Sequence, residues 1–367
     1  MIQSLRPILT FLILALSASS YLAAQENPMQ FMSRANAKVA RAAALKNRWE
    51  GPIDGPKLQK KKKIVMISSD MSDAGINGIY YGLREASTSA GWEVLYIDCR
   101  GQCTSKTLIK QALDMKADGI VLAGVDASSQ SKGISIANEA KIPVVGWHAS
   151  SKHGATDGLF TNIATNPKEV AQVAALYAVV EANSKAGIVV LTDSSNPFLM
   201  AKSSAIVETI KQCEGCKLLG VEDIALHEAR NKLKPAVENL IKRHGSKWTH
   251  VIGVNDFYFD LLETPAIAAL LENNKVVGVS AGDGSSTAYK RIRNKGVQVG
   301  TMPEPFSMHA WQLVDELNRA FSGAEPSGLT SQVHLVTAQN IAYDGGSKNT
   351  FEPSNDFRAQ YQKYWNK

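Results

Sequence analysis

Polar and aromatic side chains recur along this chain just after short apolar runs. Carboxylates and amides accept or donate hydrogen bonds, while Trp and Tyr offer flat apolar faces. This combination suits a neutral ligand rich in hydroxyl groups, because each hydroxyl both donates and accepts and a sugar ring stacks on an aromatic plate. The candidate ligand-binding residues are Asp70, Asp73, Asp126, Trp147, His148, Asn166, Asp193, Asn196, Asn255, Tyr258, Asp283 and Glu304.

A simpler interpretation is that these Asp and Asn residues cap the helices that follow them or form tight turns. For any single residue, a capping or turn role is as well supported as a ligand-binding role. It explains the whole set less well, because Trp147, Tyr258 and Glu304 do not serve as caps. A lone histidine such as His148 is more typical of a hydrogen-bonding pocket residue than of a metal ligand.

Two common motifs of catalysis are not found in the sequence, namely a phosphate loop ending in Lys-Ser/Thr and His-Glu-x-x-His. The pairs Asp70/Asp73 and Asp256/Asp260 could act as a glycosidase acid and nucleophile only at a particular separation. We therefore expect a binding protein that is not an enzyme, with no cofactor and no metal.

Short apolar runs alternate with amphipathic stretches through most of the chain and set the places of these side chains. The first run, residues 64–67, is typical of a buried parallel strand. Further strands are expected over residues 93–98, 119–122, 142–146, 186–191, 217–221, 250–254, 276–280 and 297–301. The helices expected between them include residues 106–115, 132–140, 198–211, 228–243 and 259–271.

Two consecutive runs of this alternation predict two parallel sheets with helices on both faces. The fold class is therefore α/β, with two doubly wound lobes. A last amphipathic helix, with Met308 and Trp311 on its apolar face, is expected to pack on the first sheet. Ligands bind beyond the carboxyl ends of parallel strands, which is where the polar residues stand. The expected units are an extension or linker (25–62, with a helix near 33–49), lobe I (63–163 plus 304–325) and lobe II (164–303 plus 326–367).

The amino terminus has the outline of a secretory signal peptide. Arg6 precedes an apolar run over residues 8–18, and small residues lead to Ala24, after which we expect cleavage. The alternative is a transmembrane anchor, but the run is shorter than the roughly 20 residues that span a bilayer. Residues 1–24 are thus expected to direct export and then to be removed.

The overall composition is that of a globular protein, with 44% hydrophobic and 20% charged residues. The formal net charge of +6 includes four lysines in the run 60–63, which is typical of a solvated linker. An exported chain also no longer shares a compartment with nucleic acid. We therefore expect no nucleic-acid partner.

The four cysteines form two close pairs in the sequence, Cys99/Cys103 and Cys213/Cys216. In an oxidising compartment each pair is a candidate disulfide. A zinc site of four cysteines would require the pairs to meet, although the expected fold places them on different lobes. Redox-active thiols are the other alternative.

Several segments together resemble the type I periplasmic binding proteins of sugar ABC importers, the ribose- and galactose-binding group. The resemblance covers residues 64–337 and lies in the order and spacing of four short segments: 117–122 with Asp126 beyond, 141–145, 254–256, and 278–284. It implies two lobes that close over a ligand and are joined by three crossing segments, near residues 161–165, 302–304 and 325–332. It also implies that Asn255 and Asp283 bind sugar hydroxyls.

The sequence departs from the ribose-binding pattern after the fourth strand. His148-Ala149 stands where those members carry Asp-Arg, so an arginine fork for ring oxygens is missing. The arginine of the first helix in lobe II is also replaced, with Lys202 and Ser203 nearby. The resemblance still implies a monomer in the periplasm that delivers a sugar, polyol or sugar-like ligand to an inner-membrane ABC permease. The alternative is a periplasmic sensory protein that feeds a chemoreceptor or sensor kinase.

Overall fold

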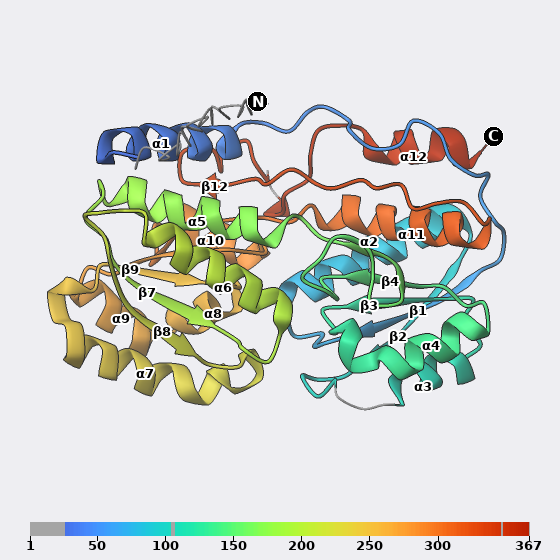
Figure 1. Ribbon diagram of the computed structural model, residues 1–367, viewed down its shortest axis with the longest axis horizontal. Coiled ribbons are helices and arrows are strands. Elements are labelled where there is room, and N and C mark those ends of the chain that lie inside the picture. The colour runs from blue at the N-terminus through green and yellow to red at the C-terminus, as the bar shows by residue number, and fades with distance from the viewer. Residues whose placement is uncertain (1–25, 104–106, 346–347, 367) are drawn as a thin grey trace, which may run out of the picture.

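Two α/β lobes lie side by side in a computed structural model that describes residues 26–103, 107–345 and 348–366 (Figure 1). Lobe I contains a six-stranded sheet in the order β2-β1-β3-β4-β6-β5. Its central strands are buried because helices cover both faces, as the unbroken apolar runs predict. Its elements are β1 (Lys63–Ser68), α2 (Ala74–Ala90), β2 (Glu93–Asp98), α3 (Leu108–Asp114), β3 (Gly119–Ala123), α4 (Ser131–Glu139), β4 (Val144–Trp147), β5 (Gly154–Thr156) and β6 (Leu159–Ile163).

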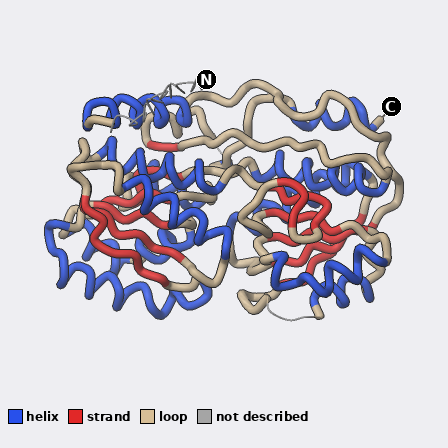
Figure 2. Tube along the Cα trace, viewed as in Figure 1, coloured by secondary structure: helices blue, strands red, loops and turns tan. Residues whose placement is uncertain are grey.

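Lobe II repeats this architecture with a sheet in the order β12-β11-β10-β9-β7-β8. Figure 2 shows the two sheets as separate layers, each flanked by helices. The α/β fold class with two lobes is confirmed. The elements of lobe II before the chain returns to lobe I are α5 (Pro167–Glu181), β7 (Gly187–Thr192), α6 (Pro197–Ile210), β8 (Lys217–Asp223), α7 (Ala229–His244), β9 (His250–Gly253), α8 (Phe257–Leu262), α9 (Pro265–Asn273), β10 (Val277–Ser280), α10 (Ser286–Arg293) and β11 (Gln298–Thr301).

The structure corrects the predicted elements at several places. The edge strands β5 and β12 (Val336–Thr337) are antiparallel to their neighbours and were not expected. The helix expected over residues 259–271 is two helices, because Thr264 precedes Pro265 and is pushed out of helical conformation. The first helix, α1 (Pro28–Ala43), begins earlier than expected, where Asn27 and Gln30 form a capping box.

The long helix α11 (Phe306–Phe321) packs on lobe I, as its amphipathic pattern predicts. Its buried face includes Trp311, Leu313 and Leu317, and it lies against α2, β4 and β6. Lobe I is therefore completed by a segment that follows lobe II in the sequence.

The extension before β1 is not a linker, because it packs on both lobes. Helix α1 lies on α5 of lobe II, where Phe31 and Ala35 join a buried cluster with Leu176. Farther along, the Trp49 ring lies edge-on to Tyr361 at 5.2 Å on the lobe I side. The backbone of residues 54–59 then bonds to α11, for example where the Gln59 N–H donates to Asn318 Oδ1 at 2.8 Å.

The C-terminal helix α12 (Phe357–Trp365) belongs to the lobe I core, which corrects the expected assignment of residues 326–367 to lobe II. The Trp365 ring stacks on Trp311 at 5.3 Å, and its Nε1–H donates to Asp315 at 2.8 Å. Only the earlier part of this segment, including β12 beside β11, stays with lobe II. Five segments of the described chain therefore cross between the lobes: 44–48, 164–166, 302–305, 322–335 and 352–356.

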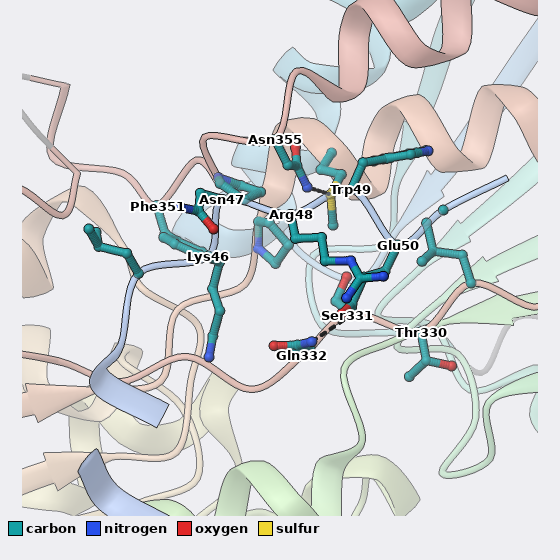
Figure 3. Close-up of a pocket in the computed structure, with 16 residues that line it drawn as sticks. Lys46, Asn47, Arg48, Trp49, Glu50, Thr330, Ser331, Gln332, Phe351 and Asn355 are labelled. Carbon is teal, nitrogen blue, oxygen red and sulfur yellow. Dashed lines mark hydrogen bonds between the residues drawn. The ribbon is translucent and has the colours of Figure 1, made fainter. Parts of the chain in front are cut away.

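Two of these crossings, 44–48 and 352–356, were not expected, and we call them the added crossings. A cavity of about 120 Å³ lies between the added crossings and the segment 329–332 (Figure 3). Gln332 Nε2 donates to Glu50 Oε2 at 2.6 Å across one wall. The walls include Trp49, Met308 and Phe351. Residues 45–51 and 351–355 thus build this surface together with segments of the expected hinge.

The cysteine pairs differ from each other. Cys213 and Cys216 form the expected disulfide. Cys99 and Cys103 are free thiols, which corrects the second expected bridge. The Cys103 thiol lies 3.7 Å from the carbonyl oxygen of Ser69, and its hydrogen bond with Cys99, together with burial, raises its pKa above the usual range.

Among the described residues, no helix has the length and apolar character needed to cross a bilayer. The expected signal peptide, residues 1–24, lies outside the described part of the chain.

Candidate ligand-binding cleft

A cavity of about 440 Å³ lies between the lobes, at the carboxyl ends of strands from both sheets. This size falls in the range of pockets that bind small molecules. Five residues predicted from strand ends line it: Asp70, Asp73, Asp126, Asp193 and Asn196.

Three basic residues of the cavity wall were missed by sequence reasoning. Arg100 follows β2, whereas His227 and Arg230 follow β8. Each of these strands is an edge strand of its sheet. The strand-end rule applies to these edge strands too and would have identified these residues. Their donors complement the carboxylates, so the cavity offers both donors and acceptors.

The cavity carboxylates are held by local hydrogen bonds. Asp73 caps α2, with Oδ1 accepting from Gly75 N at 2.8 Å and Ile76 N at 3.0 Å. Asp193 accepts from Ser195 N and Leu226 N, both at 2.9 Å. The capping interpretation is therefore right for Asp73, whereas Asp193 accepts in a turn from Ser195 and does not cap a helix. It does not exclude ligand contacts, because each carboxylate oxygen has more than one lone pair.

Deeper in the cleft, Asn255 and Asp283 bond to each other instead of lining the cavity. Asn255 Nδ2 donates to Asp283 Oδ2 at 3.1 Å. The other Asp283 oxygen lies 3.3 Å from Nζ of Lys202, whose side chain is completely buried. Lys202 therefore supplies a positive charge in the helix where the ribose-binding pattern has an arginine.

Asp73 of lobe I and Asp283 of lobe II face each other across the closed cleft. A Cβ atom built on Gly75 would lie 3.0 Å from an Asp283 oxygen and 3.1 Å from an Asp73 oxygen. The gap here is about 10 Å³, room for one water molecule at most. Burial, and then the Asp283 carboxylate, raise the pKa of Asp73 to about 7.

This raised pKa predicts a pH dependence of stability. A folded-state pKa above the unfolded value means that the folded state binds the proton more tightly, so stability falls as the pH rises from about 4 to about 7 and the penalty is then constant. The variant Asp73→Asn can still cap α2 but does not ionise. We expect its melting temperature, relative to wild type, to be higher at pH 8 than at pH 5. A difference that is the same at both pH values would contradict this assignment.

Trp147 and His148 form an aromatic stack with Phe198 of the other lobe. The His148 ring lies 3.8 Å from the Trp147 ring and 4.1 Å from the Phe198 ring, with interplanar angles of 13° and 22°. All three side chains are buried. The stack lies at the base of the cleft and connects the lobes directly.

A buried polar network behind the stack joins the three expected crossing segments. Thr165 Oγ1 donates to Glu304 Oε2 at 2.5 Å, and His309 contacts Ser331 Oγ at 2.7 Å. Burial would raise the pKa of Glu304, but His148, His309 and Thr165 outweigh it and lower this pKa to about 2. Glu304 is therefore a charged residue of the hinge. It does not line the cavity, although the sequence analysis predicted it as a ligand-binding residue.

His309, which belongs to this network, is neutral. Burial lowers the pKa of His309 to about 4, despite the nearby Glu304 carboxylate. Its Nδ1 accepts from Trp147 Nε1 at 3.1 Å, so its own proton lies on Nε2 and is donated to Ser331. The base of the cleft is thereby bonded to the third crossing segment.

Two further expected residues lie away from the cavity. The Tyr258 side chain is completely buried in lobe II, and its hydroxyl donates to Ile224 O at 2.6 Å. Asn166 caps α5, where its side-chain oxygen accepts from Lys168 N and Glu169 N. These residues therefore have structural contacts, and the expected aromatic plate at Tyr258 is not formed.

Comparison with known families agrees with this geometry. Residues 64–325, more than half of the chain, match the model of the periplasmic binding protein domain. The chain belongs to this family of binding proteins. The matched range stops short of α1 and α12, so the two added hinge crossings lie outside it. No curated relative matches the sequence.

Solved periplasmic binding proteins share the fold at low sequence identity. A solute-binding protein from Agrobacterium vitis with bound α-D-tagatopyranose is 14% identical, with a TM-score of 0.68 over 79% of this chain and 99% of that one. A sugar ABC transporter protein from Yersinia enterocolitica is 16% identical, with a TM-score of 0.69 over 83% and 93%. A Bacillus halodurans solute-binding protein with bound myo-inositol is 15% identical, with a TM-score of 0.63 over 76% and 96%.

Proposed function

We propose that this periplasmic binding protein is the solute-binding component of an ABC importer and captures a sugar, polyol or sugar-like ligand between its lobes. The observation that carries the proposal is the interlobe cavity, to which both lobes contribute hydrogen-bonding groups. Lobe I contributes Asp70, Asp126 and Arg100, and lobe II contributes Asp193 and Arg230.

The cavity chemistry supports a polyhydroxylated ligand. Carboxylates accept from hydroxyl groups, and the two guanidinium groups donate to hydroxyl or ring oxygens. Phe257 and Leu199 add apolar surface for the carbon skeleton of the ligand. Solved relatives in this fold hold tagatose and myo-inositol, which agrees with this ligand class.

Capture follows from closure of the lobes. At the cleft mouth, a Cβ atom on Gly101 of lobe I would lie 3.0 Å from Cβ of His227 in lobe II, so the lobes already touch there. A ligand in the cavity contacts both lobes at once and therefore binds the closed state better than an open one. It shifts the population toward closure, and the closed surface is what a membrane partner would recognise.

We infer a monomer in the periplasm with an inner-membrane permease as its partner and no role for nucleic acid. The family supports the compartment and the transport role. The alternative, a sensory protein that feeds a chemoreceptor or kinase, uses the same closure. Neighbouring genes for a permease and an ATPase would favour import, and a neighbouring kinase gene would favour sensing.

Thermal-shift screening against pentoses, hexoses and polyols tests the ligand class. We expect at least one to raise the melting temperature in a saturable way, because a ligand that binds only the folded state stabilises it by mass action. If no member of the panel stabilises the protein, the sugar or polyol assignment is wrong.

A further inference from the structure

The base of the cleft is filled by one of the protein's own side chains. The His148 imidazole occupies a slot one ring thick between Trp147 of lobe I and Phe198 of lobe II. Flat, apolar walls at this spacing suit the ring of a ligand. In the closed structure that space is taken, so a ligand ring cannot enter it.

The backbone and the polar atoms of His148 show that it is not an ordinary core residue. Its φ angle is 52°, in the left-handed region that disfavours a residue with a Cβ atom. Its Nε2 atom is buried and faces Glu304 Oε1 at 3.5 Å, which is longer than an ordinary hydrogen bond. The left-handed backbone is the unfavourable feature, and it calls for an explanation beyond packing.

The polar groups beside the slot also pair with one another. Lys202, Asp283 and Asn255 satisfy one another, and the remaining gap near Asp283 is only about 10 Å³. The open volume of about 440 Å³ lies farther out, between Asp126 and Arg230. The closed cleft is therefore divided into a filled inner part and an open outer part.

We propose that His148 is a specificity-determining plug that excludes a ligand ring from the inner cleft and confines the ligand to the outer cavity. This inference rests on the proposed function and deepens it, since it names the residue that limits which ligands fit. A ligand held in the outer cavity meets the carboxylates and the guanidinium groups of Arg100 and Arg230. It does not stack between Trp147 and Phe198.

The variant His148→Gly tests the plug directly with free imidazole as the probe. Glycine adopts a φ of 52° without strain, so the variant is expected to fold. Imidazole should fill the vacated slot and raise the melting temperature of His148→Gly by about 2–4 °C in a saturable way. Wild type should show no such rise. His148→Asn, which also tolerates this backbone conformation, serves as a second variant and should respond less than His148→Gly.

The sugar and polyol panel then tests specificity. We expect His148→Gly to bind at least one ring-containing member at least tenfold more tightly than wild type does. His334→Gly is the matched control, because His334 is also buried and stacked, at 4.2 Å on Phe351, but away from the cleft. Its ligand preference should equal that of wild type.

Two results would overturn the plug. One is an imidazole response that is absent from both His148 variants or equal in wild type. The other is a ligand preference in His148→Gly that matches that of His334→Gly. The imidazole measurement requires no sugar, so it can succeed or fail independently of the proposed ligand class.

Discussion

Replacing Lys202 with methionine is expected to destabilise the protein by about 3–5 kcal/mol. The Lys202 side chain is completely buried, and its Nζ lies 3.3 Å from Asp283 Oδ1 and 3.3 Å from Val254 O. Without it, the Asp283 carboxylate stays buried with Asn255 as its remaining donor and with Asp73 close by. An uncompensated buried charge costs far more than the loss of an exposed ion pair. Urea unfolding of both proteins at pH 7 measures this difference.

Lys234→Met is the matched control for this prediction. Lys234 pairs with Glu238 on the exposed face of α7. Its replacement is expected to cost less than about 1 kcal/mol. The double variant Lys202→Met/Asp283→Asn should recover part of the loss, because it removes both charges of the buried pair. Equal losses of unfolding free energy in Lys202→Met and Lys234→Met would show that the buried Lys202 does not compensate the charge of Asp283.

Replacing Trp365 with alanine is expected to cost about 3–5 kcal/mol. The Trp365 side chain is buried, stacks on Trp311 and donates to Asp315. Its removal would leave a cavity in lobe I and take a hydrogen bond from a buried carboxylate. The free energy of unfolding measures this loss.

Tyr343→Ala provides the comparison within the same C-terminal segment. Tyr343 is 62% exposed, so its change is expected to stay within about 0.5 kcal/mol. A loss at Trp365 as small as that at Tyr343 would mean that α12 is not part of the lobe I core.

Local patterns in the sequence predict the two lobes well. Unbroken apolar runs predict β1 and β3 because both faces of a parallel sheet are buried, and the spacing of apolar residues predicts α11. The strand-end rule likewise finds Asp126 and Asp193, because parallel strands bring their carboxyl ends to one edge.

Contacts between distant segments are not visible in such patterns. Trp49 and Trp365 join lobe I through aromatic neighbours that are far away in the sequence. Residues 25–62 therefore resemble a linker, and α12 falls in a segment that the sequence places in lobe II. His148 is predicted at the cleft, but its stacking partner Phe198 comes from the other lobe. Asn255 and Asp283 follow the neighbouring strands β9 and β10, and the hydrogen bond between their side chains cannot be read from local spacing.

Calorimetric titration of the stabilising sugar or polyol against wild type, Asp126→Ala and Arg230→Ala tests the central claim most directly. These two residues line the cavity from opposite lobes. We predict one ligand per wild-type chain and affinity at least tenfold weaker in each variant, because the ligand bridges both lobes. Binding that depends on only one of the lobes, or on neither, would contradict capture between them.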